Sequence, residues 1–158
     1  ASYSVSGGEG HYELKPESST IMPFISAYQG SADFKLNSDI PTSFDLTLIA
    51  GKQSLDLRSI NATDLNVETV FGETVITLPK EGKVNGKVGV VFGELVVRIP
   101  RGTAVQFKMD TVVVGKSIPQ DFLKTEDTVS SPEAASGKAD IVLSLENVVG
   151  SVKIEYLP

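Results

Sequence analysis

Glycine recurs along this chain at a nearly constant spacing of 21 residues. The series runs Gly10, Gly30, Gly51, Gly72, Gly93 and Gly115, and then Gly150 after one long insertion. A period of about 20 to 50 residues is typical of architectures in which each repeat supplies one supersecondary unit. The glycine spacing therefore favours a fold built of equal, stacked units.

The residues around each glycine follow one pattern. After Gly93, apolar side chains occupy the second, fourth and sixth positions, and polar Arg98 lies between them. Such alternation predicts a strand with one buried face. Before the glycines, apolar residues also recur two positions upstream (Ile49, Val70, Val91, Val113, Val148) and five positions upstream (Leu46, Val67, Val88, Leu145). Each unit is therefore predicted to hold two short strands that meet at the glycine.

Two strands of this length cannot bury their own apolar face, so the units must stack and share a core. The sequence predicts an all-β fold, a single-domain β-solenoid over residues 1–158, β-helix-like, with about six to seven coils. In such a stack Leu55, Ile76 and Val97 would lie in adjacent strands. An antiparallel sandwich or meander is the alternative. The constant phase of the glycines favours the solenoid.

The repeat is irregular between Gly93 and Gly115, which lie one residue farther apart than the preceding glycines. Asp110 then falls where an inward aliphatic residue is expected. A β-bulge that turns Phe107 and Met109 inward would restore the pattern.

The repeat stops over residues 119–139, which read as an insertion or lid loop that covers part of the core or one exposed edge. Within it, residues 120–127 are expected to form a turn of helix. Residues 1–20 are the other candidate cap.

Composition excludes some functions. A net charge of −6 and a pI near 4.8 argue against a nucleic-acid surface. There is no cysteine, and no run is apolar enough to span a bilayer. The start at Ala1 instead of methionine is expected from a removed signal or lipid-bearing segment, or from a trimmed chain.

Residues for catalysis are scarce. His11 is the only histidine, which excludes histidine triads and multi-histidine metal sites. The carboxylates Asp33, Asp45 and Asp56 occupy different phases of the repeat, unlike the paired acids of a carbohydrate-active enzyme. We therefore predict no catalytic residue, no cofactor and no metal.

The positions directly after the glycines carry charges. Stacked coils would place Glu73 and Glu94 one above the other, between Lys52 and Lys116. A cation could bridge the two carboxylates. A charge ladder balanced by the lysines is the favoured interpretation.

Two apolar features remain. Phe71 and Phe92, each followed by Gly-Glu, are predicted to stack across coils. At the third position after the glycine, Val75, Val96 and Ile118 are apolar where alternation predicts polar residues. They are covered by the 119–139 insertion, or they mark a surface for a partner or for self-association.

The segments 67–79 and 88–100 share the order valine, phenylalanine, glycine, alternating strand and proline. In this they resemble the toast-rack, LiaF-like family of bacterial envelope proteins, over roughly residues 40 to 118. Its members are described as adhesins or as regulators of the cell-envelope stress response. The resemblance implies an all-β, solenoid-like fold and a non-enzymatic protein of the bacterial cell envelope or surface, and it transfers no catalytic residue.

Three functional hypotheses follow. The first is an adhesin-like module, extracellular or in the bacterial cell envelope, that binds a protein or glycan partner. The second is a regulatory domain of the envelope stress response that binds a membrane sensor. The third, and the least favoured, is a solenoid carbohydrate-active enzyme.

Overall fold

The computed structural model describes residues 2–6, 9–13 and 36–158. The chain divides into two compact units, Ala1–Phe34 and Lys35–Pro158. In the first unit, strands β1 (Ser2–Ser6) and β2 (Glu9–Glu13) pair antiparallel, so Gly10 lies in this pair and not in a parallel coil. The coil predicted at Gly30 and much of the predicted cap at residues 1–20 lie outside the described residues.

The second unit holds one sheet of seven strands in the order β3-β4-β5-β9-β6-β8-β7. Five of the strands are long and mutually parallel, and two short ones pair antiparallel beside β6. The bounds are β3 (Thr42–Asp56), β4 (Ala62–Thr77), β5 (Val84–Ile99), β6 (Val105–Ser117), β7 (Leu123–Lys124), β8 (Thr128–Ser130), α1 (Pro132–Ala135) and β9 (Ile141–Tyr156).

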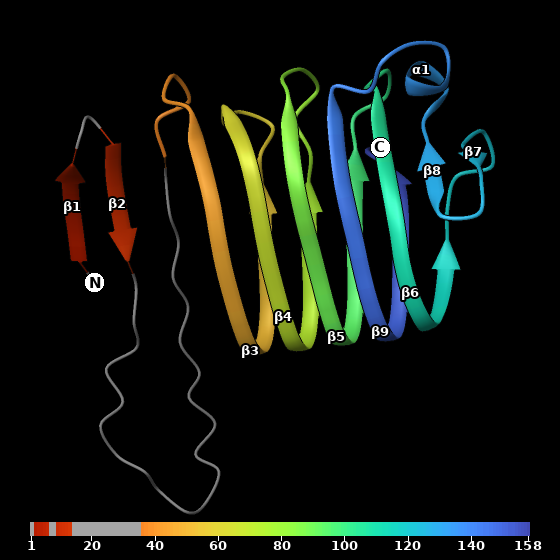
Figure 1. Ribbon diagram of the computed structural model, residues 1–158, viewed down its shortest axis with the longest axis horizontal. Helices are drawn as coiled ribbons and strands as arrows, with labels where there is room; N and C mark the ends of the chain where they lie inside the picture. The colour runs from red at the N-terminus through yellow and green to blue at the C-terminus, as the bar shows by residue number, and fades with distance from the viewer. Residues whose placement is uncertain (1, 7–8, 14–35) are drawn as a thin grey trace, which may run out of the picture. The chain divides into compact units, whose positions relative to one another are not determined.

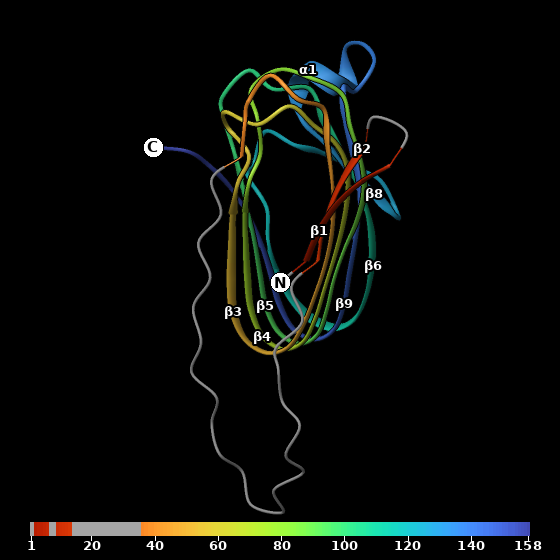
Figure 2. The same ribbon diagram turned by 90° about the vertical axis from the view of Figure 1, so that its left-hand side faces the viewer.

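Each long strand folds back on itself at a bend, so that its two arms form opposite walls of a coil (Figures 1 and 2). At the bends of β3, β4, β5 and β9 stand Gly51, Gly72, Gly93 and Gly150, paired in one row. Their φ angles lie between 131° and 147°, which side chains rarely allow. The prediction of two strands meeting at a glycine is confirmed for these four coils.

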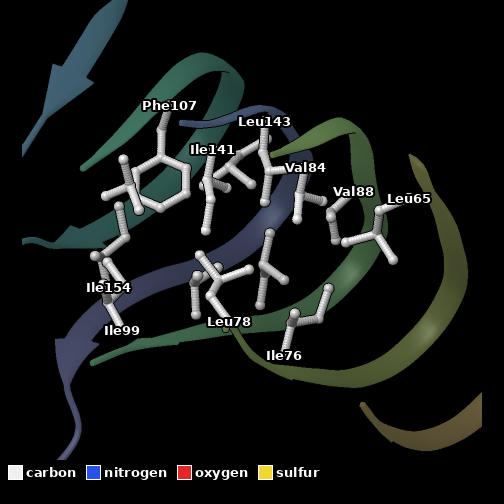
Figure 3. Packing of buried hydrophobic residues seen from close by; sticks show 14 of the residues in the cluster. Leu65, Ile76, Leu78, Val84, Val88, Ile99, Phe107, Ile141, Leu143 and Ile154 are labelled. Atoms are coloured by element: carbon white, nitrogen blue, oxygen red, sulfur yellow. The ribbon is translucent and has the colours of Figure 1, made fainter. Parts of the chain in front are cut away.

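The stacked coils enclose one apolar interior. Leu55, Ile76 and Val97 pair in adjacent strands, as predicted, and Ile154 continues their row. Figure 3 shows side chains of β4, β5, β6 and β9 pointing into this shared interior. The parallel register confirms the β-solenoid over the antiparallel sandwich.

Coil order departs from sequence order. The last strand, β9, lies between β5 and β6, where it pairs in parallel with both. The repeat by itself predicts that β6 stacks directly on β5. That order was wrong because every coil offers the same apolar ladder, and alternation alone does not reveal which coils are neighbours.

Strand β6 is also shifted by one residue against the predicted phase. Val114, not Gly115, lies opposite Gly150. Phe107 and Met109 point inward and Asp110 outward, as expected, but the register between β6 and β9 runs without the predicted bulge. The extra residue between the glycines is therefore absorbed by moving the glycine off the bend.

The 119–139 insertion covers the β6 end of the core. Strand β8 pairs antiparallel with β6, and β7 pairs with β8. Phe122 and Val129 join the buried cluster, at 5% and 4% exposed. The helix lies at α1 and not within residues 120–127 as predicted, because those residues form β7 and its turns.

A buried serine fixes this cap to the coils. Ser131 is fully buried at the start of α1. Its Oγ donates to the carbonyl of Thr103 at 2.9 Å and accepts from the amide of Val105 at 3.1 Å. The same oxygen caps α1 by accepting from the amide of Ala134. One side chain therefore ties the helix to the strand that it covers.

Tyr156 joins the last coil to the cap, and its ionisation gives a first prediction. Its hydroxyl donates to Asp121 at 2.8 Å, and its ring lies 5.8 Å from that of Phe122. Burial, and then the Asp121 carboxylate, raise the pKa of Tyr156 to about 12. Because the fold favours the neutral phenol, Tyr156 contributes fully to the free energy of unfolding below pH 10. This contribution is lost as the pH rises from 10.0 to about 12.

We expect one phenolate of the folded chain to appear near pH 12, and Tyr156→Phe to remove it from the near-ultraviolet titration curve. The difference between the two curves isolates Tyr156 among the chain's four tyrosines. A lost component centred near pH 10 would contradict the assignment.

Candidate binding surface at the bends

An exposed apolar strip runs along the bends of the five long strands, and we call it the bend strip. Figure 1 shows these bends at the lower edge of the sheet. The outermost members of the strip, Ile49 and Val112, are 73% and 71% exposed, and Phe92 at its centre is 44% exposed. The strip consists of Ile49 and Ala50 on β3, Val70 and Phe71 on β4, Val91 and Phe92 on β5, Val148 and Val149 on β9, and Val112 and Val113 on β6.

Two consecutive residues of each coil point outward here because the chain turns at the bend. The repeat predicts that the residues two before each glycine belong to the apolar pattern, and it does not predict a surface there. A signal was present in the sequence. The apolar positions two and five before the glycine are three residues apart, so they lie on opposite faces of an alternating strand. Strict alternation cannot bury both. The buried positions are those five before the glycine, such as Val67 and Val88.

The strip has a rigid support. Phe71 and Phe92 stack as predicted, with ring centroids 5.1 Å apart and planes inclined by 7°. Beneath the bends, the buried Asn147 donates its Nδ2 to the carbonyls of Ser151 at 3.1 Å and Gly93 at 3.4 Å. Hydrogen bonds thus hold neighbouring bends together under the exposed side chains.

Carboxylates line both sides of the strip. The outward row on the first arms is Thr47, Glu68, Gly89, Glu146 and Asp110. The row directly after the bend is Lys52, Glu73, Glu94, Ser151 and Gly115. Within β4, β5 and β9 these two rows hold four carboxylates and no basic residue. An apolar surface with acidic margins results.

The first of these rows has a notch at Gly89. It lies between Glu68 of β4 and Glu146 of β9, its paired neighbours in the sheet. A hollow of about 150 Å³ opens here, lined also by Lys87, Val70 and other residues of the three coils. Because Gly89 has no side chain, this hollow extends from the acidic row to the bend strip.

The side chain of Lys87 is a cation that already lies beside this hollow. Its ammonium lies 2.8 Å from a carboxylate oxygen of Glu146. Glu146 chiefly raises the pKa of Lys87, and Glu68 and Asp110 add to the effect. The hollow therefore favours positive charge, and among the described residues its Glu68 carboxylate makes no ion pair.

The structure brings together only part of the partner surface predicted at Val75, Val96 and Ile118. Val75 and Val96 are paired neighbours on the outer face of the second arms. Val96 is only 6% exposed, and its other neighbour is Lys153. Because β6 is shifted, Ser117 occupies the next place in this row and Ile118 packs against the core. The 119–139 insertion pairs with the first arm of β6, at the end of the stack.

The predicted charge ladder holds in one half. Glu73 and Glu94 are neighbours, and Lys52 lies 2.6 Å from Glu73. Beyond Glu94 stands Ser151 and not Lys116, because β9 is inserted and β6 is out of phase. The prediction that Lys116 balances Glu94 was wrong.

Asp45 and Asp56, two of the remaining acidic candidates, contact different partners. Asp56 pairs with Arg58 at 2.6 Å, and Asp45 accepts from Asn66 at 3.0 Å. Asp33 and the side chain of His11 lie outside the described residues. Within the ranges that the structure describes, no group of three or more His, Cys, Asp or Glu side chains is placed to hold a metal ion.

None of the helices in the described residues is long and apolar enough to cross a membrane. Among curated proteins, none matches this chain. A similar solved structure is the crystal structure of a putative cell adhesion protein from Clostridium sporogenes, which shares 22% sequence identity. The likeness has a TM-score of 0.79 and covers 99% of this chain and 75% of that one. It shows that the two share a fold.

The family comparison agrees with the coil pattern. The model of Toast_rack_N, the N-terminal domain of toast_rack (DUF2154), matches residues 1–98. The match includes the repeats around Gly51, Gly72 and Gly93, whose parallel coils form the larger part of the sheet. With well over half of the sequence matched, the chain belongs to the family of toast_rack N-terminal domains.

Proposed function

We propose that this chain is a non-catalytic, adhesin-like binding module of the bacterial cell surface or envelope, and that it binds its partner through the bend strip. The observation that carries the proposal is the strip itself. Its apolar side chains are exposed on five hydrogen-bonded coils, where burying them inside the solenoid is geometrically excluded. Contiguous exposed apolar surface of this kind is typical of interaction sites.

Family membership and the shared fold of the Clostridium sporogenes protein support a place at the cell surface or envelope. The predicted surface at Val75, Val96 and Ile118 is a weaker candidate for the contact. Val96 offers almost no accessible area, whereas Phe92 is 44% exposed. An aromatic ring on a rigid support is also the kind of anchor that dominates protein interfaces.

The test is capture of a partner from bacterial envelope fractions by the purified chain, followed by identification of the partner and a binding measurement with that partner purified. Phe92→Glu places a charge in the centre of the strip, and because the side chain is exposed we expect it to fold normally. Leu123→Glu is the matched control, since Leu123 is 56% exposed in β7 of the cap.

We expect the identified partner to bind the wild type and Leu123→Glu equally, and Phe92→Glu at least about tenfold more weakly, as for a central aromatic anchor. Equal binding by all three proteins would move the contact away from the strip. If no envelope component binds the purified chain, the proposed function is wrong.

A further inference from the structure

The notch at Gly89 has no explanation in the packing of the coils. A Cβ added at Gly89 would approach no atom closer than 3.9 Å, the distance to the carbonyl oxygen of Val67. By contrast, a Cβ at Gly93 would overlap the carbonyl oxygen of Gly72. Glycine within a strand weakens the strand and leaves nothing to pack. At Gly93 the backbone requires glycine, whereas at Gly89 it does not.

The absence of a side chain at Gly89 leaves the space between Glu68 and Glu146 open to an incoming group. The hollow there continues to Val70, Val91 and Val148 of the bend strip. A group entering there would meet two carboxylates on its flanks and an apolar surface beside them. These surroundings suit a long aliphatic stem that ends in a positive charge.

The charges around the strip select the class of partner. On β4, β5 and β9, the carboxylates of Glu68, Glu146, Glu73 and Glu94 border the apolar side chains, and Lys87 is the one basic residue near them in these coils. At the outer coils, Lys52 of β3 pairs with Glu73, and Lys116 lies on β6. Among these margin carboxylates, Glu68 and Glu94 therefore make no ion pair within the described residues. Negative margins favour a basic partner through electrostatic complementarity.

The same charges disfavour two other occupants. A second copy of this chain that docked strip to strip would bring acidic margins together, and like charges across an interface are unfavourable. An anionic membrane surface attracts basic segments and would be repelled by these carboxylates. A basic, apolar protein segment is the occupant that fits both the strip and its margins.

We propose that the bend strip binds a segment of a partner protein that is apolar along one side and carries a lysine or arginine, and that this basic side chain enters the notch at Gly89 between Glu68 and Glu146. The inference rests on the proposed function and names the partner class for the same surface. Five coils at a strand spacing of about 4.8 Å give a strip about 19 Å long. A helix of about 13 residues has this length.

The pairing of Lys87 with Glu146 supports this assignment. An ammonium of the chain itself already lies 2.8 Å from Glu146, beside the notch. Glu68, on the other side, is left for the incoming cation. A bound lysine or arginine would therefore complete a row in which positive and negative groups alternate.

The probe is a synthetic helical peptide of about 14 residues, with leucines along one side and lysines beside them. The same peptide with glutamates in place of the lysines is its control. Binding of each to the full chain is measured by calorimetry at low and at physiological salt. We expect the lysine peptide to bind at least about tenfold more tightly, with an affinity that falls as salt rises.

Two variants test the notch. Gly89→Val fills it with a residue that strands favour, and Glu68→Gln removes its unpaired charge without changing its shape. We expect each to weaken the lysine peptide about threefold to tenfold. Glu126→Gln, an exposed carboxylate between β7 and β8, is the matched control and should change nothing. Thermal unfolding of each variant verifies that it is folded.

Several results would overturn the inference. Equal binding of the lysine and glutamate peptides would show that charge does not select the partner. If Gly89→Val binds the lysine peptide as tightly as the wild type does, the notch is not where the basic side chain enters. Binding to anionic phospholipid vesicles that Glu68→Gln strengthens, or a concentration-dependent dimer that Phe92→Glu abolishes, would identify another occupant of the strip. If an envelope partner still depends on Phe92 while the lysine peptide fails, the partner class alone is wrong.

Discussion

Gly93→Ala is expected to destabilise the fold by about 3 kcal/mol or more, because two separate costs coincide at one residue. The φ angle of Gly93 is 147°, which an alanine adopts only under strain. In addition, the new Cβ would overlap the carbonyl oxygen of Gly72 in the adjacent coil. That atom belongs to the backbone, so it cannot move aside without opening the sheet.

The measurement is urea unfolding of the purified variant, with a fall in melting temperature of about 10 °C as a second readout. Gly89→Ala is the matched control, only four residues away on the same strand. Its Cβ has free space, so we expect unchanged or slightly higher stability, by up to about 1 kcal/mol. If both variants unfold at the same urea concentration, the close stacking of the bends does not require glycine at position 93.

Phe107→Ala is expected to cost about 3–5 kcal/mol through loss of burial and the cavity left behind. Phe107 is 0% exposed and is the largest of the fully buried side chains. It pairs with Leu143 of β9 on one side and with Val129 of the cap on the other. Its removal would therefore loosen both the inserted coil and the cover of the core.

The comparison is with Phe92→Ala in the bend strip. Phe92 is 44% exposed, and its stacking on Phe71 is worth about 0.5–1.5 kcal/mol. We expect a loss of about 1.5 kcal/mol at most, measured as the shift of the urea midpoint at constant slope. A loss as large as that of Phe107→Ala would mean that the strip serves stability, and it would weaken the case for a binding surface.

Much of the coil could be predicted from residues alone. The rows through Leu55, Ile76 and Val97, the stacked Phe71 and Phe92 and the glycine bends all appear in the structure as expected. These features depend on interactions between neighbouring repeats of the same phase. A constant period therefore specifies them, because in-register stacking places equal positions side by side.

The binding surface was harder to predict. Alternation describes a straight strand, and at a bend it fails, so Val91 and Val148 are exposed although they repeat like core residues. The acidic margin at Glu146 and the notch at Gly89 lie far apart in sequence and meet only because β9 is inserted beside β5. No local pattern around either residue reveals that contact.

The sequence by itself determined the unit of this protein: a coil of about twenty-one residues, apolar on its inner face, with glycine where the chain turns. Period and alternation suffice for that, since both express the local geometry of a strand and a bend. Only the tertiary structure decided the order of the coils, with β9 between β5 and β6, and the shift of β6 that moves Lys116 and Ile118 out of their expected rows. The reason is that the interior of each coil accepts any neighbour with the same ladder of apolar side chains. The choice among such neighbours depends on the connections, the cap and the fit of the whole stack.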